Sequence, residues 1–83
     1  MNKIEWSKTS LKQLRKIPNS KLIVKKVVDE LKDFSDSRNV KRLTNHKYDY
    51  RLRVGNYRVL FDHDDIFKII DIQEVKKRDE RTY

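Results

Sequence analysis

Three arginines near the middle of the sequence have the type and spacing of a phosphate-binding site. Arg51 and Arg53 are two residues apart, so in a β-strand both side chains point to the same face. The Gly55-Asn56 pair that follows is typical of a tight hairpin turn, which returns Arg58 beside the first two. A guanidinium is always charged and binds phosphate oxygens through paired N–H groups. The spacing therefore predicts a hairpin that presents three arginines to a phosphate; the alternative is a strand face kept soluble by arginine.

The other chemically capable side chains are weaker candidates. His63 precedes two aspartates, but this combination in an expected turn is more typical of a solvated loop than of a metal or acid–base site. His46, beside Lys47, either touches nucleic acid or simply lies in a loop. Trp6 could stack on a base, although its place before an amphipathic segment favours the core. The sequence therefore predicts no metal site.

Composition limits the chain to one small, basic domain, residues 1–83. Hydrophobic residues make up 36% and charged residues 41%, so the core is thin and one sheet face is expected to be wet. The absence of cysteine excludes disulfides, thiolate zinc sites and a cysteine nucleophile. No apolar run approaches a membrane span and the N-terminus lacks a signal-peptide pattern, which indicates a cytoplasmic protein without a membrane partner.

Charge favours a polyanionic partner, because the net charge is +8. Residues 1–45 hold 12 Lys and Arg against five Asp and Glu, whereas residues 46–83 hold nine against eight. The first half therefore carries the long-range attraction, and the second half carries individually placed charges.

The first half of the chain is typical of two helices. Residues 4–6 alternate as a short strand, and Ser7 or Thr9 can cap a helix whose apolar residues recur at helical spacing. Pro18 ends that helix, and one residue of the Asn19-Ser20 pair caps a second. The apolar positions are Leu11, Leu14 and Ile17, then Ile23, Val24, Val27, Val28, Leu31 and Phe34. Because the connection is short, the helices are expected to pack as an antiparallel hairpin.

From Tyr48 onward the pattern changes to strands, expected at about 48–54, 57–62 and 66–75, with a turn at 63–65. Apolar residues on both faces of the last strand imply a central position, next to the strand at the N-terminus. Residues 40–43 resemble a connecting segment. The prediction is an α+β fold of order β-α-α-β-β-β: a helix hairpin packs on one face of a four-stranded, mainly antiparallel sheet, and the basic face lies opposite.

With these elements in place, the sequence resembles the RelE/ParE superfamily of toxins from type II toxin–antitoxin systems. It is most similar to the RelE-type ribosome-dependent mRNA endonucleases, or mRNA interferases. Residues 6–17, Trp-Ser-Lys-Thr-Ser-Leu-Lys-Gln-Leu-Arg-Lys-Ile, look like the family's first helix. Residues 50–59, Tyr-Arg-Leu-Arg-Val-Gly-Asn-Tyr-Arg-Val, look like its central hairpin, which is the more specific motif. Residues 75–83 resemble its closing basic segment with a tyrosine, so the resemblance covers nearly the whole chain.

The resemblance implies roles for particular residues. Arg51 and Arg58 match the hairpin residues that hold the scissile phosphate of mRNA. Arg78 matches the tail arginine that stabilises the transition state, with Arg81 as the other option. Tyr83 matches the tyrosine assigned to base stacking or proton transfer. The other basic side chains expected to bind RNA are Arg53, Lys47, Lys76, Lys77 and Arg81.

Chemistry alone gives this site only part of what RNA cleavage needs. Attack by a 2′-hydroxyl requires a proton acceptor, a proton donor and cations around the phosphorane. Arginines supply the cations but do not titrate, and the pKa of Tyr83 would have to fall from about 10. Asp49 stands where the best-known members carry a basic residue. The isolated protein is therefore expected to be a poor nuclease, and the ribosome would have to orient the substrate.

Three functions remain open at this stage. They are a ribosome-dependent mRNA endonuclease that inhibits translation, a ParE-like inhibitor of DNA gyrase that cuts nothing, and a weakened homologue that still binds an antitoxin. The coexistence of the hairpin arginines, Arg78 and Tyr83 favours the first. The resemblance implies a cognate acidic antitoxin, the ribosome and mRNA as partners. It also implies operator DNA bound only through the antitoxin complex, and no metal or other cofactor.

Overall fold

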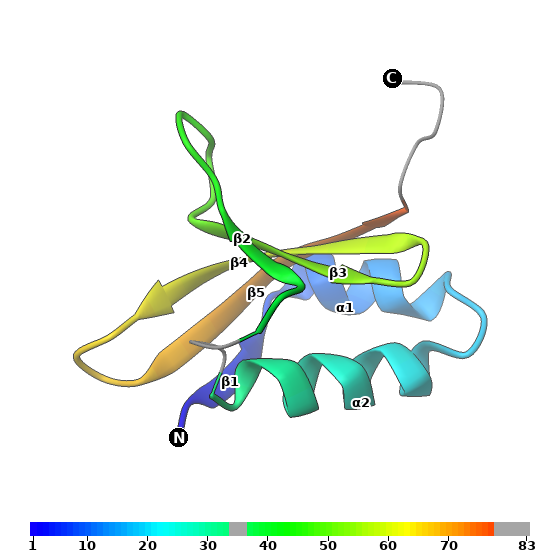
Figure 1. The fold of residues 1–83 in the computed structure, drawn as a ribbon. Coiled ribbons are helices and arrows are strands. Elements are labelled where there is room, and N and C mark those ends of the chain that lie inside the picture. The colour runs from blue at the N-terminus through cyan, green and yellow to red at the C-terminus, as the bar shows by residue number, and fades with distance from the viewer. Residues whose placement is uncertain (34–36, 78–83) are drawn as a thin grey trace.

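In the parts of the chain that the computed structural model describes, residues 1–33 and 37–77, five strands form one sheet and two helices cover one of its faces (Figure 1). The sheet order is β1-β5-β4-β3-β2; β1 runs parallel to β5, and the other pairs are antiparallel. The strands are β1 (Lys3–Trp6), β2 (Val40–Arg42), β3 (Tyr50–Val54), β4 (Tyr57–Asp64) and β5 (Ile69–Lys77). The predicted α+β class and the central position of the last strand are confirmed.

The two helices form where helical spacing predicted them, but only the first has the side-chain cap that the sequence suggested. α1 (Lys8–Arg15) begins after Ser7, whose Oγ accepts a hydrogen bond from the amide of Ser10 at 3.0 Å. α2 (Ser20–Leu31) follows Asn19, which has a left-handed backbone with φ 59° and makes no side-chain cap hydrogen bond. Figure 1 shows α1 and α2 running in opposite directions on the same side of the sheet.

The core lies between the helices and the sheet. It consists of alternate strand residues, one residue of α1 and one stripe of α2: Leu14, Ile23, Val27, Leu31, Leu52, Val54, Val59, Phe61, Ile70, Ile72 and Val75. Trp6 packs against this cluster, as expected of a core residue. Leu11, which is 44% exposed, and Val28 lie outside the core, because the stripe that faces the sheet is narrower than predicted. Phe34, also assigned to the stripe, lies outside the described residues.

The last strand begins three residues later than predicted, at Ile69. The predicted turn around the histidine was also wrong, because β4 continues to Asp64. The Asp64 carboxylate accepts hydrogen bonds from the amides of Ile66 and Phe67 at 3.0 and 3.1 Å, and Lys68 adopts a positive φ of 56°. This local capping fixes a turn in which Ile66 and Phe67 are 85% and 73% exposed rather than buried in a strand.

The prediction of four strands was wrong, because residues 40–43, expected to connect other elements, contain β2. Lys41 of β2 lies opposite Arg51 of β3, and beyond the strand the Leu43 amide donates a hydrogen bond to the carbonyl of Asp49 at 2.9 Å. A three-residue strand has too little alternation to be recognised in the sequence. It forms because β3 supplies its hydrogen-bonding partners.

Candidate nucleic-acid interface

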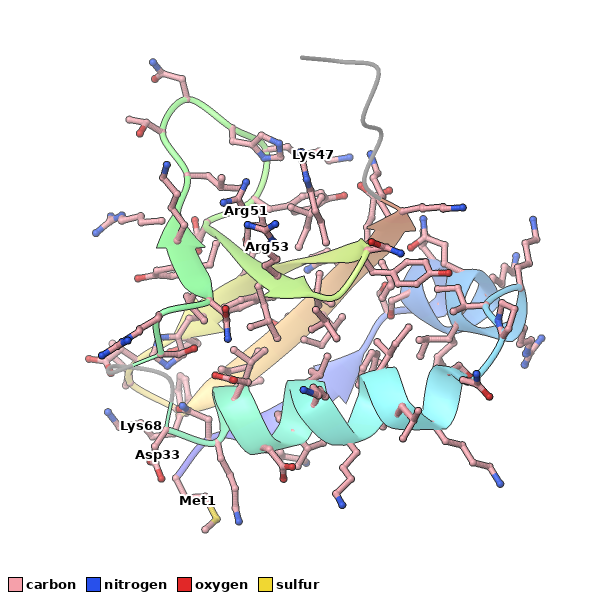
Figure 2. The ribbon with its side chains drawn as sticks, turned by 45° about the vertical axis from the view of Figure 1, so that its right-hand side comes forward. Met1, Asp33, Lys47, Arg51, Arg53 and Lys68 are labelled. Carbon is pink, nitrogen blue, oxygen red and sulfur yellow. The ribbon has the colours of Figure 1, made fainter. Side chains whose placement is uncertain are left out.

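The three hairpin arginines lie on the sheet face that the helices leave uncovered. Because Leu52 and Val54 of β3 point into the core, alternation directs Arg51 and Arg53 to the opposite face. Arg58 of β4 lies directly opposite Arg53, so it shares that face. Figure 2 shows Arg51 and Arg53 on the side of the sheet away from α2. We call this side the open face.

Three cations form a row across the open face, which we call the basic row: Arg53, Arg58 and Lys76. Arg53 pairs with Arg58 between β3 and β4, and Arg58 pairs with Lys76 between β4 and β5. Directly opposed residues of antiparallel strands have Cβ atoms about 4.5–5.5 Å apart, where like charges destabilise the sheet. A bound phosphate relieves this repulsion, because its oxygens accept hydrogen bonds from cationic donors.

Arg51 lies half-buried beside the basic row and carries an unsatisfied donor. On the open face it stands between Lys41 of β2 and Leu60 of β4. Its Nε is buried, and no hydrogen-bond acceptor within the described ranges reaches it. A buried donor without an acceptor costs about 1–3 kcal/mol. Such a group binds a water, an ion or a ligand, or has a catalytic role.

Glu74 places a carboxylate in this basic region, and sequence analysis missed it. The side chain lies opposite Leu60, is 19% exposed, and has its Oε1 3.6 Å from Lys76 Nζ and 3.5 Å from Gln13 Nε2. Burial by itself raises the pKa of Glu74. The hydrogen bond from the Tyr48 hydroxyl, the charge of Lys76 and the hydrogen bond from Gln13 outweigh burial, so the pKa lies below its ordinary value. Glu74 is therefore ionised at neutral pH.

Helix α1 fixes the part of β5 that carries Glu74. Ser7 Oγ donates a hydrogen bond to the carbonyl of Gln73 at 2.8 Å, and the Gln13 side-chain oxygen accepts one from the amide of Val75. The pairing of β4 with β5 shifts register in the same region. These contacts hold the strand at its irregular point, so the carboxylate has a defined position on a rigid element.

The segment before β3 brings a cation and an aromatic ring to the same place. The hydrogen bond that Tyr48 donates to Glu74, together with burial and the charge of Glu74, raises the pKa of Tyr48 above its ordinary value despite the nearby charge of Lys47. Lys47 Nζ lies 5.5 Å from the centre of the Tyr48 ring. The centres of the His46 and Tyr48 rings are 5.9 Å apart. Figure 2 shows Lys47 on the same side of the sheet as the labelled arginines.

The other end of the open face is acidic. Glu5 of β1 lies opposite Asp71 of β5, and Asp71 lies opposite Asp62 of β4; we call these three residues the acidic row. Burial, together with the charges of Glu5, Asp62 and Asp64, raises the pKa of Asp71. The open face is therefore polarised, and it attracts a polyanion only at the end that carries the basic row.

Four predicted site residues remain. Arg78, Arg81 and Tyr83 lie outside the described residues. Lys77 lies opposite Tyr57, whose ring packs against the core, so alternation directs Lys77 away from the open face.

A hollow of about 400 Å³ lies far from the basic row, lined by Met1, Asn2, Asp33, Tyr50, His63, Asp65 and Lys68. Figure 2 labels Met1, Asp33 and Lys68 around it, well away from the arginines. His63 contributes its Nε2, 3.2 Å from the side-chain oxygen of Asn2. Within residues 1–33 and 37–77, no group of three or more histidine or acidic side chains is placed to hold a metal ion. In the same ranges no helix is long and apolar enough to cross a membrane.

Comparisons with known proteins agree with this architecture. Residues 4–82 match the family model described as the ParE toxin of type II toxin–antitoxin systems, parDE. The isolated RelE toxin of E. coli is similar at a TM-score of 0.75 and 19% identity, with 96% of this chain and 87% of that chain covered. The toxin–antitoxin complex RelBE2 of Mycobacterium tuberculosis is similar at a TM-score of 0.70 and 23% identity, with 93% of this chain and 98% of that chain covered. The RelE–RelB complex of Pyrococcus horikoshii is similar at a TM-score of 0.70 and 24% identity, with 95% of this chain and 97% of that chain covered. No curated protein matches the sequence.

Proposed function

This chain belongs to the ParE toxin family of type II toxin–antitoxin systems, and we propose that it inhibits translation by cleaving mRNA on the ribosome. The observation that supports this activity is the basic row beside Arg51, whose buried Nε meets no acceptor in the described part of the chain. Fixed cations stabilise the extra charge of a phosphorane more than that of the starting phosphate. In the proposed reaction a ribose 2′-hydroxyl attacks the adjacent phosphate of mRNA.

The proposed roles follow from position on the open face. Arg51 and Arg58 hold the scissile phosphate, and Arg53, Lys76 and Lys47 bind the flanking backbone. The tail completes the site: Arg78 or Arg81 stabilises the transition state, and Tyr83 stacks on a base or transfers a proton. These tail assignments rest on the resemblance alone. Lys77 of β5, directed away from the open face, has no part in this site.

The chain by itself aligns an RNA substrate poorly, and the ribosome supplies that alignment. Rate enhancement in RNA cleavage depends on aligning the 2′-oxygen, the phosphorus and the leaving oxygen, which requires the RNA to be held on both sides. The basic row is short and the acidic row lies at the other end of the same face, so the open face offers a free RNA strand little to hold it in line. An mRNA already fixed in the ribosome needs only the local cations.

The second candidate function is inhibition of DNA gyrase without nuclease activity. The matching family model is described by ParE rather than by RelE, and Asp49 replaces the basic residue of the best-known nucleases. A third candidate, a weakened homologue that only binds antitoxin, predicts no growth arrest at all.

The deciding experiment is induced expression with pulse labelling of protein and DNA synthesis, followed by mapping of mRNA 5′ ends. Immediate loss of protein synthesis together with new cuts within translated messages supports the proposal. Loss of DNA synthesis while translation continues supports the gyrase candidate. Arg51→Ala, tested beside Lys25→Ala on the exposed side of α2, shows whether the effect depends on the open face.

The proposed partner is a cognate acidic antitoxin, and operator DNA is bound only through that complex. RelE toxins of similar structure are found in complexes with RelB antitoxins. The excess of lysine and arginine in residues 1–45 offers charge complementarity to a disordered acidic segment. Co-purification with the product of the adjacent reading frame tests this, and recovery of nucleic acid without a small protein contradicts it.

A further inference from the structure

Cleavage by 2′-hydroxyl attack needs a proton acceptor, and the arginines and lysines of the basic row are unsuited to that task because they are protonated at neutral pH. An ionised carboxylate is suited to it. Glu74 is such a group and lies on the same face as the cations. It is diagonal to Arg58, because Arg58 pairs with Lys76, two residues along β5. Diagonal neighbours on adjacent strands lie about 7–8 Å apart, still within reach of long side chains, so Arg58 and Glu74 share one part of the open face.

Glu74 is held in place rather than freely solvated. Three side chains approach it from three different elements: Tyr48 from the segment before β3, Gln13 from α1 and Lys76 from β5 itself. Leu60 stands opposite it, so the carboxylate has an apolar neighbour on the β4 side. The side chain nevertheless remains 19% exposed, which leaves it reachable from the open face.

We propose that Glu74 is the general base that takes the proton of the attacking 2′-hydroxyl when a ribose–phosphate unit lies on the basic row. The inference rests on the proposed nuclease function. The hydroxyl proton moves to the carboxylate, the O2′–P bond forms and the P–O5′ bond breaks. The products are a 2′,3′-cyclic phosphate and a 5′-hydroxyl, whose oxygen receives its proton from water.

The groups that face Glu74 set the pH at which it can act. The Tyr48 hydroxyl, Gln13 and the Lys76 ammonium stabilise its charged form, and burial opposes them. The guanidinium of Arg58 lies diagonally across β4, and that of Arg51 lies beyond Leu60. A competing role has the opposite consequence: if Glu74 only neutralises the basic row before RNA arrives, its removal strengthens RNA binding and accelerates cleavage.

The experiment measures single-turnover cleavage of mRNA on programmed ribosomes across a range of pH. Glu74→Gln keeps the shape and loses the base, so we expect a decrease of about 10²-fold or more. Tyr48→Phe keeps the ring and the carboxylate but loses the hydrogen bond. The acid limb of its pH–rate profile therefore moves to higher pH. Glu5→Gln in the acidic row is the matched control and leaves the rate unchanged.

Each outcome separates the inference from the function on which it rests. A wild-type protein that does not cut mRNA overturns both. A wild-type protein that cuts, with Glu74→Gln equally fast or faster, overturns only the role of Glu74. If the acid limb of the pH–rate profile does not shift in Tyr48→Phe, the role of Glu74 as general base is also contradicted. Melting curves identify any loss of folding, and Tyr48→Phe still tests the carboxylate if Glu74→Gln proves unstable.

Discussion

Arg58 of β4 lies directly opposite Arg53 of β3, so the hairpin register places two arginine residues side by side on the open face. A folded protein gains nothing from this repulsion, which works against the hairpin. Lys76 extends the row on the next strand, and the buried Nε of Arg51 adds an unsatisfied donor beside it. All these features become favourable when a phosphate is bound. This concentration of cationic donors on one face is thus an indication of a phosphate site.

Removing one of the two opposed arginines separates binding from stability. We expect Arg53→Ala to weaken binding of single-stranded RNA and to lower the slope of log affinity against log salt by about 0.7, the value for one lost phosphate contact. Thermal stability should be unchanged or slightly higher, because a like-charge pair disappears. Titration of a fluorescent RNA at several salt concentrations measures the slope. Lys25→Ala on α2 should leave the slope intact; an equal loss there would mean that binding is diffuse.

The different burial of two phenylalanines predicts that replacing them costs very different amounts of stability. Phe61 is fully buried between the sheet and the helices, whereas Phe67 lies exposed in the β4–β5 turn. Phe61→Ala should lower the free energy of unfolding by about 3–5 kcal/mol. Phe67→Ala should change it by less than about 0.5 kcal/mol. Denaturant unfolding of both variants provides the comparison, and similar costs at the two positions would contradict the described strand boundaries.

The acidic row predicts a pH dependence of stability. The pKa of Asp71 is raised in the folded state, so the neutral form is favoured there. Its contribution to stability is fully present below the unfolded pKa, near 3.9, and is lost as the pH rises through the folded pKa. Asp71→Asn stays neutral at every pH. It should be more stable than wild type at pH 7, by less than about 1 kcal/mol, and the difference should vanish below pH 4.

Asp65 supplies the control for that measurement. Its pKa is lowered by the hydrogen bond and charge of Lys68, whose Nζ lies 2.8 Å away. Stability from a lowered pKa is present above the unfolded pKa and is lost as the pH falls through the folded one. Asp65→Asn should therefore be neutral or slightly destabilising at pH 7. A gain in stability for both variants would indicate only a general effect of removing negative charge.

The local sequence signals determine most of this fold. The alternation of Arg51 to Val54, followed by Gly55-Asn56, predicts the hairpin, and the structure has the same turn and the same facing of side chains. Helical spacing and Pro18 predict the helix pair equally well. These features are specified by neighbours in the chain, which is why the sequence alone reveals them.

The sequence-based predictions were wrong or incomplete where contacts with distant residues or side chains decide the structure. Ile66 and Phe67 read as strand residues because they are apolar, but the Asp64 carboxylate binds their amides and holds them in a turn. Strand β2 forms because β3 offers it a partner. Glu74 becomes conspicuous only when Tyr48, distant in sequence, is found to donate to it.

The account depends most on whether the open-face cations hold the scissile phosphate. Arg58 lies at the centre of the basic row, between Arg53 and Lys76, and its side chain does not belong to the core. Replacing it should therefore affect catalysis without unfolding the protein. Arg58→Lys keeps the charge but loses the paired donors of the guanidinium, so it should restore only part of the rate.

The most direct measurement is the single-turnover rate of mRNA cleavage on programmed ribosomes for wild type, Arg58→Ala and Arg58→Lys, with melting curves for each. We predict that Arg58→Ala slows cleavage by about 10²–10³-fold, as for loss of one donor to a developing anion. Its melting curve should show that the protein stays folded, and Arg58→Lys should fall between the two rates. An Arg58→Ala protein that melts like wild type and cuts mRNA at the wild-type rate would show that the basic row is not the phosphate site.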